Sequence, residues 1–176
     1  MHNLPGLMDR IAIKKKILDF TINGVEKLLQ ENPDLEFYAF AYDCMAFYGV
    51  INLCFNTEEE FQKSLIYYKG KYPTHYDADK DVLRLKYNTA DWVFPMFETL
   101  DFFSREELTT FQDEENVDEL IETLLETFCE CLIEFTATAT YKKIPKTADF
   151  IVFCVDHDET FEDAQKRFEK VKARYN

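Results

Sequence analysis

The fold of this chain is decided by the stretch Leu35–Phe61, which has the sequence LEFYAFAYDCMAFYGVINLCFNTEEEF. It predicts two strands, Leu35–Tyr42 and Phe47–Phe55, joined by a turn within Asp43–Ala46 and followed by the start of a helix. Both strands are apolar on both faces, whereas a strand with one solvated face alternates apolar and polar residues. We therefore expect an antiparallel hairpin in the middle of a sheet that is covered on both sides.

Side chains alternate between the two faces of a strand, so the sequence also predicts which residues share a face. In the first strand we expect one face to carry Leu35, Phe37, Ala39 and Ala41, and the other Tyr38, Phe40 and Tyr42. In the second strand we expect one face to carry Phe47, Ile51, Leu53 and Phe55, and the other Tyr48, Val50 and Cys54.

Two later stretches predict further strands of the same sheet. Phe150–Val155 is apolar on both faces, and Val82–Tyr87 mixes apolar with basic residues, as expected of a more exposed strand. Between them, Asn88–Phe97 predicts a turn that Trp92 anchors on the sheet as a buried plug. The expected fold class is α+β, with a single central, mostly antiparallel sheet of about four strands covered by helices, in one domain over residues 1–176.

The expected helices have recognisable starts and apolar stripes. Leu7–Glu31 predicts an amphipathic helix, and Asn116–Phe135 predicts the most strongly patterned one. Thr57–Glu60 and Ser104–Glu107 have the spacing of capping boxes, in which the first and fourth residues satisfy each other's free amides. The Thr57 helix is expected to end between Tyr68 and Gly70, and a last helix to follow Thr160.

Composition excludes several classes of protein. The four glycines are scattered, so no glycine-rich loop can hold a phosphate, and no cofactor is expected. The five cysteines are odd in number and lack CxxC spacing, which predicts buried reduced thiols. The N-terminus lacks the pattern of a signal peptide, and no apolar run approaches the ~20 residues that span a bilayer. We expect a cytoplasmic protein with no membrane partner.

The charge of the chain is negative and unevenly distributed. The net charge of −14 argues against a nucleic-acid partner, because phosphates require a basic surface. Between Glu106 and Tyr141 there are eleven acids and no Lys or Arg. This segment predicts an acidic surface.

Four glutamates follow one another at helical spacing within that segment, and they are the predicted binding residues. They are Glu122, Glu126, Glu130 and Glu134, within the predicted helix Asn116–Phe135. We expect them to be exposed and uncompensated unless Lys142, Lys143 or the C-terminal helix covers them. Replacing the first three with Lys is then expected to leave folding intact and to weaken the binding of a basic partner.

Evidence for catalysis or metal binding is weaker. Asp156-His157-Asp158 follows a buried strand, where a histidine could act as a general base. Asp77, Asp79 and Asp81 alternate as in a calcium loop, but the Gly and Glu that such a loop needs at its sixth and twelfth positions are absent. The sequence therefore assigns no catalytic and no metal-binding residue, and it leaves open whether the protein is an enzyme.

Three blocks of the sequence carry a family resemblance: FYAFAYDCMAFYGVINLCFNTEEEF, LKYNTADWVF, and the apolar strand that ends in Asp156. In these blocks the chain resembles a bacterial family known as domain of unknown function 4303. Tyr87 stands where that family often has Trp. The resemblance implies a bacterial, intracellular α+β domain and carries no catalytic residues. Small acidic domains of this kind often look like immunity proteins that neutralise toxins.

Two functional hypotheses follow. In the first, the protein is a non-catalytic, immunity-protein-like interaction module whose acidic surface binds a basic, toxin-like protein. In the alternative, it is a small hydrolase or other enzyme with a site near Asp156 and His157.

Overall fold

The computed structural model describes residues 10–175 of the chain. Short 3-10 turns, written η, lie among its helices and strands. In chain order the elements are α1 (Arg10–Glu31), β1 (Phe37–Met45), η1 (Ala46–Tyr48), β2 (Val50–Asn56), α2 (Glu58–Lys71), α3 (Asp79–Lys86), η2 (Thr89–Asp91), β3 (Phe94–Asp101), α4 (Arg105–Gln112), α5 (Val117–Thr136), α6 (Ala139–Lys143), β4 (Lys146–Asp156) and α7 (Phe161–Lys172).

The four strands form one open sheet in the order β3-β2-β1-β4. Strand β2 pairs antiparallel with both β1 and β3, whereas β1 and β4 are parallel. The expected α+β class is confirmed, and so is the central position of the hairpin. Every residue of β2 and all but the last of β1 are buried, as their apolar sequences predict.

The turn of the hairpin lies later than predicted. Strand β1 continues through Asp43 to Met45, and the chain reverses through η1 and Gly49. Gly49 has φ +68°, and a Cβ there would lie 2.3 Å from Phe103 Cδ2, so the reversal depends on glycine. Phe47 and Tyr48, predicted to start the second strand, lie in this turn with exposed side chains.

The predicted alternation of faces is wrong at the start of β1. The register of β1 against β4 shifts between Phe37 and Ala39. Phe37 therefore packs on the same side as Phe40 and Tyr42, while Tyr38 joins Ala39 on the other side. A local irregularity of this kind changes the face of every residue before it.

The fourth strand is not the predicted one. Val82–Tyr87 lies mostly in α3, where acids in the first turn and bases in the last turn suit the helix dipole. The actual strand is β3, which overlaps the predicted turn Asn88–Phe97. Pro95 is compatible with β3 because β3 is an edge strand. Trp92, just before β3, is 4% exposed and forms the buried plug that we predicted.

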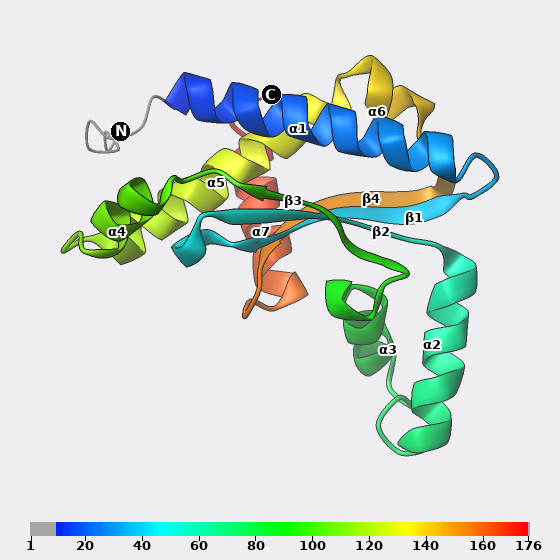
Figure 1. Cartoon of the computed structure of the whole chain (residues 1–176). Helices are drawn as coiled ribbons and strands as arrows, with labels where there is room; N and C mark the ends of the chain where they lie inside the picture. Colours follow the sequence, from blue (N-terminus) through cyan, green and yellow to red (C-terminus); the bar gives the residue numbers. More distant parts are fainter. Residues whose placement is uncertain (1–9, 176) are drawn as a thin grey trace.

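Helices cover both faces of the sheet (Figure 1). Helices α1 and α5 pack on one face over Phe40 and Tyr42, with fully buried Phe128 and Phe135 contributed by α5. On the other face, α2 and α3 project away from the sheet as an arm, and Trp92 lies in their core. Helix α7 packs against β4 and contributes side chains to both cores.

The helix boundaries agree with most of the predicted signals. Ser104 and Glu107 form both halves of a capping box, whereas at α2 we find the Thr57 half, with Thr57 Oγ1 accepting from Glu60 N. Helix α2 continues through Gly70 to Lys71, beyond its predicted end. The part of the predicted first helix before Arg10 lies outside the described residues.

Candidate functional site

The predicted binding residues lie on α5, and we call them the α5 glutamates: Glu122, Glu126, Glu130 and Glu134. The sequence predicts an uncompensated face unless the C-terminal helix or Lys142 and Lys143 cover it, and the C-terminal helix does cover Glu126. Glu126 accepts hydrogen bonds from Arg174 at 2.7 and 3.0 Å, and from Lys170 at 3.1 Å. These cations approach because α7 packs along α5. Arg174 is the main reason that the pKa of Glu126 falls to about 2.

Helix α1 neutralises the next two glutamates from the other side. Glu130 pairs with Arg10 at 2.6 Å and with Lys14 at 3.3 Å, and Lys14 also binds Glu134. Burial lowers the pKa of Lys14, but the hydrogen bonds to these partners outweigh it and raise the pKa overall.

Three of the α5 glutamates are therefore ion-paired, and Glu122 is the exposed one with no ion pair within residues 10–175. The side chains of Glu126 and Glu130 are only 25% and 13% exposed, so the expectation that they are exposed is wrong for them. Reversing Glu122, Glu126 and Glu130 to Lys would place new cations among Arg and Lys side chains. We now expect that triple change to destabilise the fold.

The other candidate, His157, lies where β1 and β4 end side by side. His157 N donates to Cys44 O at 2.8 Å and extends the pairing of these two parallel strands. The neighbouring Asp156 accepts from Ala46 N at 3.0 Å. Burial raises the pKa of Asp156, although this hydrogen bond partly offsets the effect. Asp156 thus has a structural role, because it binds the backbone of the β1–β2 turn. His157 is the residue of this pair that could belong to a functional site.

His157 faces a buried carboxylate that the sequence did not single out. Asp43 lies near the end of β1, 4% exposed, on the same face of the sheet as Ala39 and Ala41. Its Oδ2 accepts from Thr89 Oγ1 at 2.6 Å. Its Oδ1 lies 3.5 Å from His157 Nδ1 and has no hydrogen-bond partner among the described residues.

The loop that carries His157 is fixed by a half-buried ion pair between Glu159 and Arg167. Glu159 accepts two hydrogen bonds from the guanidinium of Arg167, on α7, and it also accepts from Asp156 N. Arg167 in turn donates to Cys154 O on the outer side of β4. These contacts tie the loop to α7 and to the strand, so His157 is held against Asp43 by a rigid support.

The opposite wall comes from the arm and η2. Asp91 accepts from Tyr68 OH and from Asn88 Nδ2, both at 2.6 Å. The bond to Asp91 raises the pKa of Tyr68 to about 12, so this phenol remains a donor at neutral pH. Trp92 Nε1 donates to Lys86 O at 2.9 Å and locks η2 against the end of α3. Thr89 is thereby positioned over Asp43.

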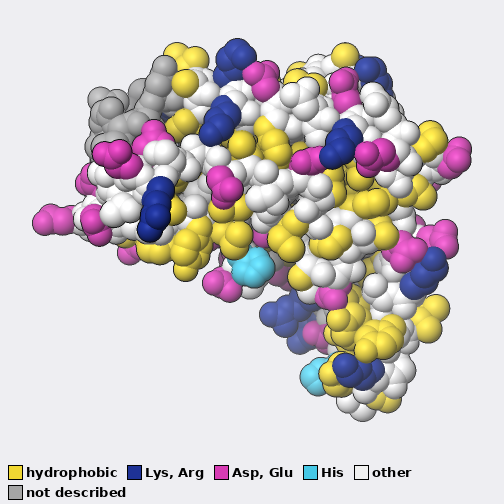
Figure 2. All heavy atoms as spheres, in the orientation of Figure 1, with side chains coloured by type: hydrophobic (Ala, Val, Ile, Leu, Met, Phe, Trp, Pro, Cys, Tyr) yellow, Lys and Arg dark blue, Asp and Glu magenta, His cyan; other side chains and the backbone are white. Residues whose placement is uncertain are grey.

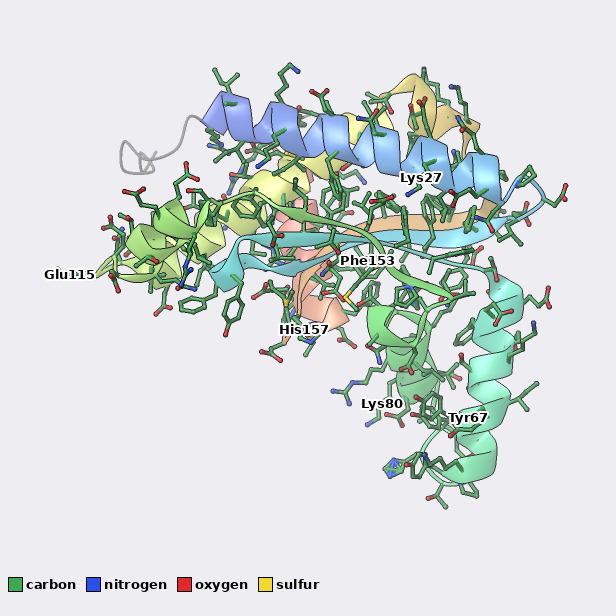
Figure 3. The ribbon with its side chains drawn as sticks, viewed as in Figure 1. Lys27, Tyr67, Lys80, Glu115, Phe153 and His157 are labelled. Carbon is green, nitrogen blue, oxygen red and sulfur yellow. The ribbon has the colours of Figure 1, made fainter. Side chains whose placement is uncertain are left out.

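A cavity of about 520 Å³ lies between these walls, and we call it the Asp43 cavity. The surface is hollowed between His157 and the arm, with acidic side chains beside His157 (Figure 2). His157 lies beneath the sheet and across from α3 (Figure 3). Among the described residues, Arg84 is the one Lys or Arg of the lining, which also contains six carboxylates: Asp43, Asp81, Asp91, Asp158, Glu159 and Glu162.

The charge of this cavity suits a cation. Asp91 and Glu159 already have internal partners, but Asp81, Asp158 and Glu162 form no ion pair within the described chain. These three acids give the entrance of the cavity a negative charge, and Asp43 adds a buried carboxylate at its bottom. The described residues contain no group of three or more His, Cys, Asp or Glu that could hold a metal ion.

Sequence reasoning identified one side of this site and missed the other. It selected His157 from its position after a buried strand, but it placed Asp43 in a turn. The sequence feature that could have identified Asp43 is a single carboxylate next to an otherwise apolar strand. Of the alternating aspartates, Asp79 and Asp81 lie in the first turn of α3 rather than in a calcium-type loop. All five cysteines are free and buried, as predicted.

Comparison with known proteins gives one match. The model of a family described as a domain of unknown function (DUF4303) matches residues 17–171, so the chain belongs to this family. No curated protein and no solved structure matches the chain. Among residues 10–175 we find no helix with both the length and the apolar composition of a membrane span.

Proposed function

We propose that this member of the DUF4303 family is a non-catalytic interaction module that binds a basic protein partner in the Asp43 cavity. The proposed partner is basic, as the sequence predicts. The proposed binding surface, however, is the Asp43 cavity at the end of the sheet and not the α5 glutamates. An immunity-like role toward a toxin is an extension suggested by the family resemblance.

The observation that carries the proposal is the buried oxygen of Asp43 that has no hydrogen-bond partner among the described residues. A buried anion without a partner is costly, and proteins usually pair such a charge or hydrogen-bond it fully. Here Thr89 satisfies one oxygen, while the other is buried beside His157 and has no hydrogen-bond partner among the described residues. Asp43 lines the cavity, and the His157 side chain that covers it is 57% exposed. A cation from a partner that displaces this imidazole would complete the set of contacts.

The acids at the entrance of the Asp43 cavity also favour a positively charged ligand. Asp81, Asp158 and Glu162 lack ion pairs in the described chain and lie around the entrance. A cluster of like charges attracts an opposite charge over several ångströms, and salt screens this attraction. Binding at this cavity should therefore depend on ionic strength.

The test uses a 12-residue peptide of Lys, Arg and Gly, with a Glu/Gly peptide as the control ligand, in isothermal titration calorimetry. We expect the basic peptide alone to bind, with an affinity that falls about tenfold between 50 and 300 mM NaCl. Asp43→Asn should abolish binding, whereas Glu122→Gln, which removes a charge outside the cavity, should retain it. Equal binding by the wild type and Asp43→Asn, or binding that ignores salt, would contradict the proposal.

A second candidate function is supported by the contact between Asp43 and His157. A carboxylate near Nδ1 can hold an imidazole so that Nε2 is free to accept a proton from water or substrate. This arrangement would suit a hydrolase acting on a cationic ester. Hydrolysis of p-nitrophenyl esters of lysine and arginine that is lost in both His157→Gln and Asp43→Asn would favour the enzyme. No turnover above the His157→Gln background would favour the interaction module.

A further inference from the structure

We infer that the outer edge of β4 binds a short, acidic, extended segment of a partner protein, which adds to the sheet as a further strand. Strand β4 is an edge strand, and it lies beside α6 and α7 (Figure 1). This surface is separate from the Asp43 cavity, and the inference does not depend on the proposed function. The observation behind it is that part of the outer backbone of β4 is covered and part is left open beside an apolar groove.

Successive residues of β4 direct their backbone groups alternately toward β1 and away from it. His157 N donates to Cys44 O at 2.8 Å, so this amide points toward β1. Because the direction alternates along a strand, the backbone groups of Val152, Cys154 and Asp156 point away from β1. Such a row of outward groups is what an edge strand offers to another strand.

The outward groups near α7 are covered, whereas those of Val152 are open. Arg167 donates to Cys154 O at 3.3 Å. Glu159 accepts from Asp156 N at 3.2 Å. On this side, neither the N–H nor the C=O of Val152 has a hydrogen-bond partner within residues 10–175. An extended segment alongside β4 would pair with both groups, as in β-strand addition.

A groove of about 470 Å³ lies along this open part of the edge. Ile151 and Val152 both line it, although Ile151 packs on the arm side of the sheet and Val152 on the side of α1 and α5. The groove therefore lies at the edge of the sheet and not over one face. Apolar walls come from α5, α6 and α7, through Ile133, Tyr141 and Phe168. These walls suit a segment with apolar side chains at alternate positions.

A lysine beside the groove lacks an acidic partner. Lys146 Nζ lies 4.3 Å from the ring centroid of Tyr141 and 5.8 Å from that of Phe150, and both residues line the groove. Lys146 donates to two backbone carbonyls but forms no ion pair among the described residues. Burial lowers the pKa of Lys146, because its charged form has lost hydration. The acid of the lining, Glu169, already lies 3.5 Å from Lys172. A carboxylate of the added segment would therefore pair with Lys146.

The probe is the peptide Gly-Glu-Val-Thr-Val-Thr-Val-Glu-Gly, labelled with fluorescein and followed by fluorescence anisotropy. Its valines share one face, and a glutamate at each end lets either strand direction place an acid near Lys146. N-methylation of the internal amides should weaken binding about tenfold or more, because it removes the backbone donors. Replacing both glutamates with glutamine should weaken binding about threefold, as expected for one partly exposed ion pair.

Substitutions on β4 locate the site. Val152→Pro removes the outward N–H, which an edge strand tolerates, and should weaken binding about tenfold. Lys146→Gln should remove the preference for the glutamate peptide over the glutamine peptide, and it tests the site even if Val152→Pro does not fold. Lys80→Gln is the control, because Lys80 lies on the arm and has no ion pair in the described chain (Figure 3). Circular dichroism establishes that each variant is folded.

The contrary results are specific to this edge. Absence of binding by the glutamate peptide, or equal binding by its N-methylated form, would overturn the inference. Full binding by folded Val152→Pro would place the peptide elsewhere and would also overturn it. An unchanged glutamate preference in Lys146→Gln would refute the acidic partner. Sedimentation velocity tests the other occupant, a second copy of the chain: a dimer that Val152→Pro dissociates would show that the edge pairs with itself and would refute the partner segment.

Discussion

Asp43→Asn should make the protein more stable while it loses its ligand. The substitution keeps the shape of the side chain, and the amide oxygen can still accept from Thr89. It removes a charge that is 4% exposed and whose second oxygen has no hydrogen-bond partner among the described residues. The new amide nitrogen takes the place of Oδ1, beside His157 Nδ1 at 3.5 Å, and can donate to that nitrogen, so an unsatisfied donor does not replace the unsatisfied acceptor. An unsatisfied buried polar group costs ~1–3 kcal/mol, and the weaker, neutral bond to Thr89 returns ~1 kcal/mol of that. The net expectation is a gain of about 1 kcal/mol in the free energy of unfolding.

The assay is urea unfolding followed by circular dichroism at pH 7.5, with thermal unfolding as a second readout. A gain of about 1 kcal/mol corresponds to about 2–4 °C in Tm for a chain of this size. Glu122→Gln is the control, because surface substitutions usually change stability by less than ~0.5 kcal/mol. If Asp43→Asn instead loses more than about 1 kcal/mol, Asp43 is a structural anchor and is not held ready for a ligand.

Three further predictions concern the fold. Trp92→Ala should lower the free energy of unfolding by ~3–5 kcal/mol, because it empties a large buried site against Tyr38 and Phe153; an unchanged urea midpoint would refute this. Gly49→Ala should lower the free energy of unfolding by ~2–5 kcal/mol, because alanine is strained at a positive φ and its Cβ would collide with the ring of Phe103. Gly70→Ala has nothing within 4 Å of the new Cβ and should stabilise α2 by ~0.5–1 kcal/mol. Equal effects of the two substitutions in thermal unfolding would contradict the structure. Glu126 has its pKa lowered from 4.5 to about 2, so it contributes stability above pH 4.5 that is lost as the pH falls toward 2. Acid titrations of unfolding should therefore show a shallower loss of stability for Glu126→Gln than for the wild type across that window, and identical slopes would refute the ion pairs.

The central hairpin was predictable because its signal is local and strong. A strand that is apolar on both faces can be stable only inside a covered sheet, and this placed β1 and β2 correctly. The turn was misplaced because the sequence lacks a standard turn pair and uses a 3-10 turn with Gly49 instead. Val82–Tyr87 was misassigned because a short stretch with few apolar residues fits both a strand and a helix. The shift between Phe37 and Ala39 depends on β4, more than a hundred residues away.

The candidate site depended on contacts that sequence cannot supply. The charges on Glu126 and Glu130 looked uncompensated because their partners lie in α1 and α7, far along the chain. Their acidic pattern is real, but tertiary packing neutralises most of it. In the same way, Asp43, Thr89 and His157 come from three separate segments and become a site only when β1, η2 and the β4–α7 loop meet.

The most direct measurement is a titration of ¹⁵N-labelled protein with the 12-residue peptide of Lys, Arg and Gly, followed by two-dimensional NMR. The amide signals that shift should be those of Thr89, His157 and Asp158 around the Asp43 cavity, and the same titration of Asp43→Asn should leave them in place. Signals of α5, including Glu122, should not move. Shifts concentrated along Val117–Thr136, with the cavity unchanged, would show that the acidic helix binds the basic group and that the Asp43 cavity does not.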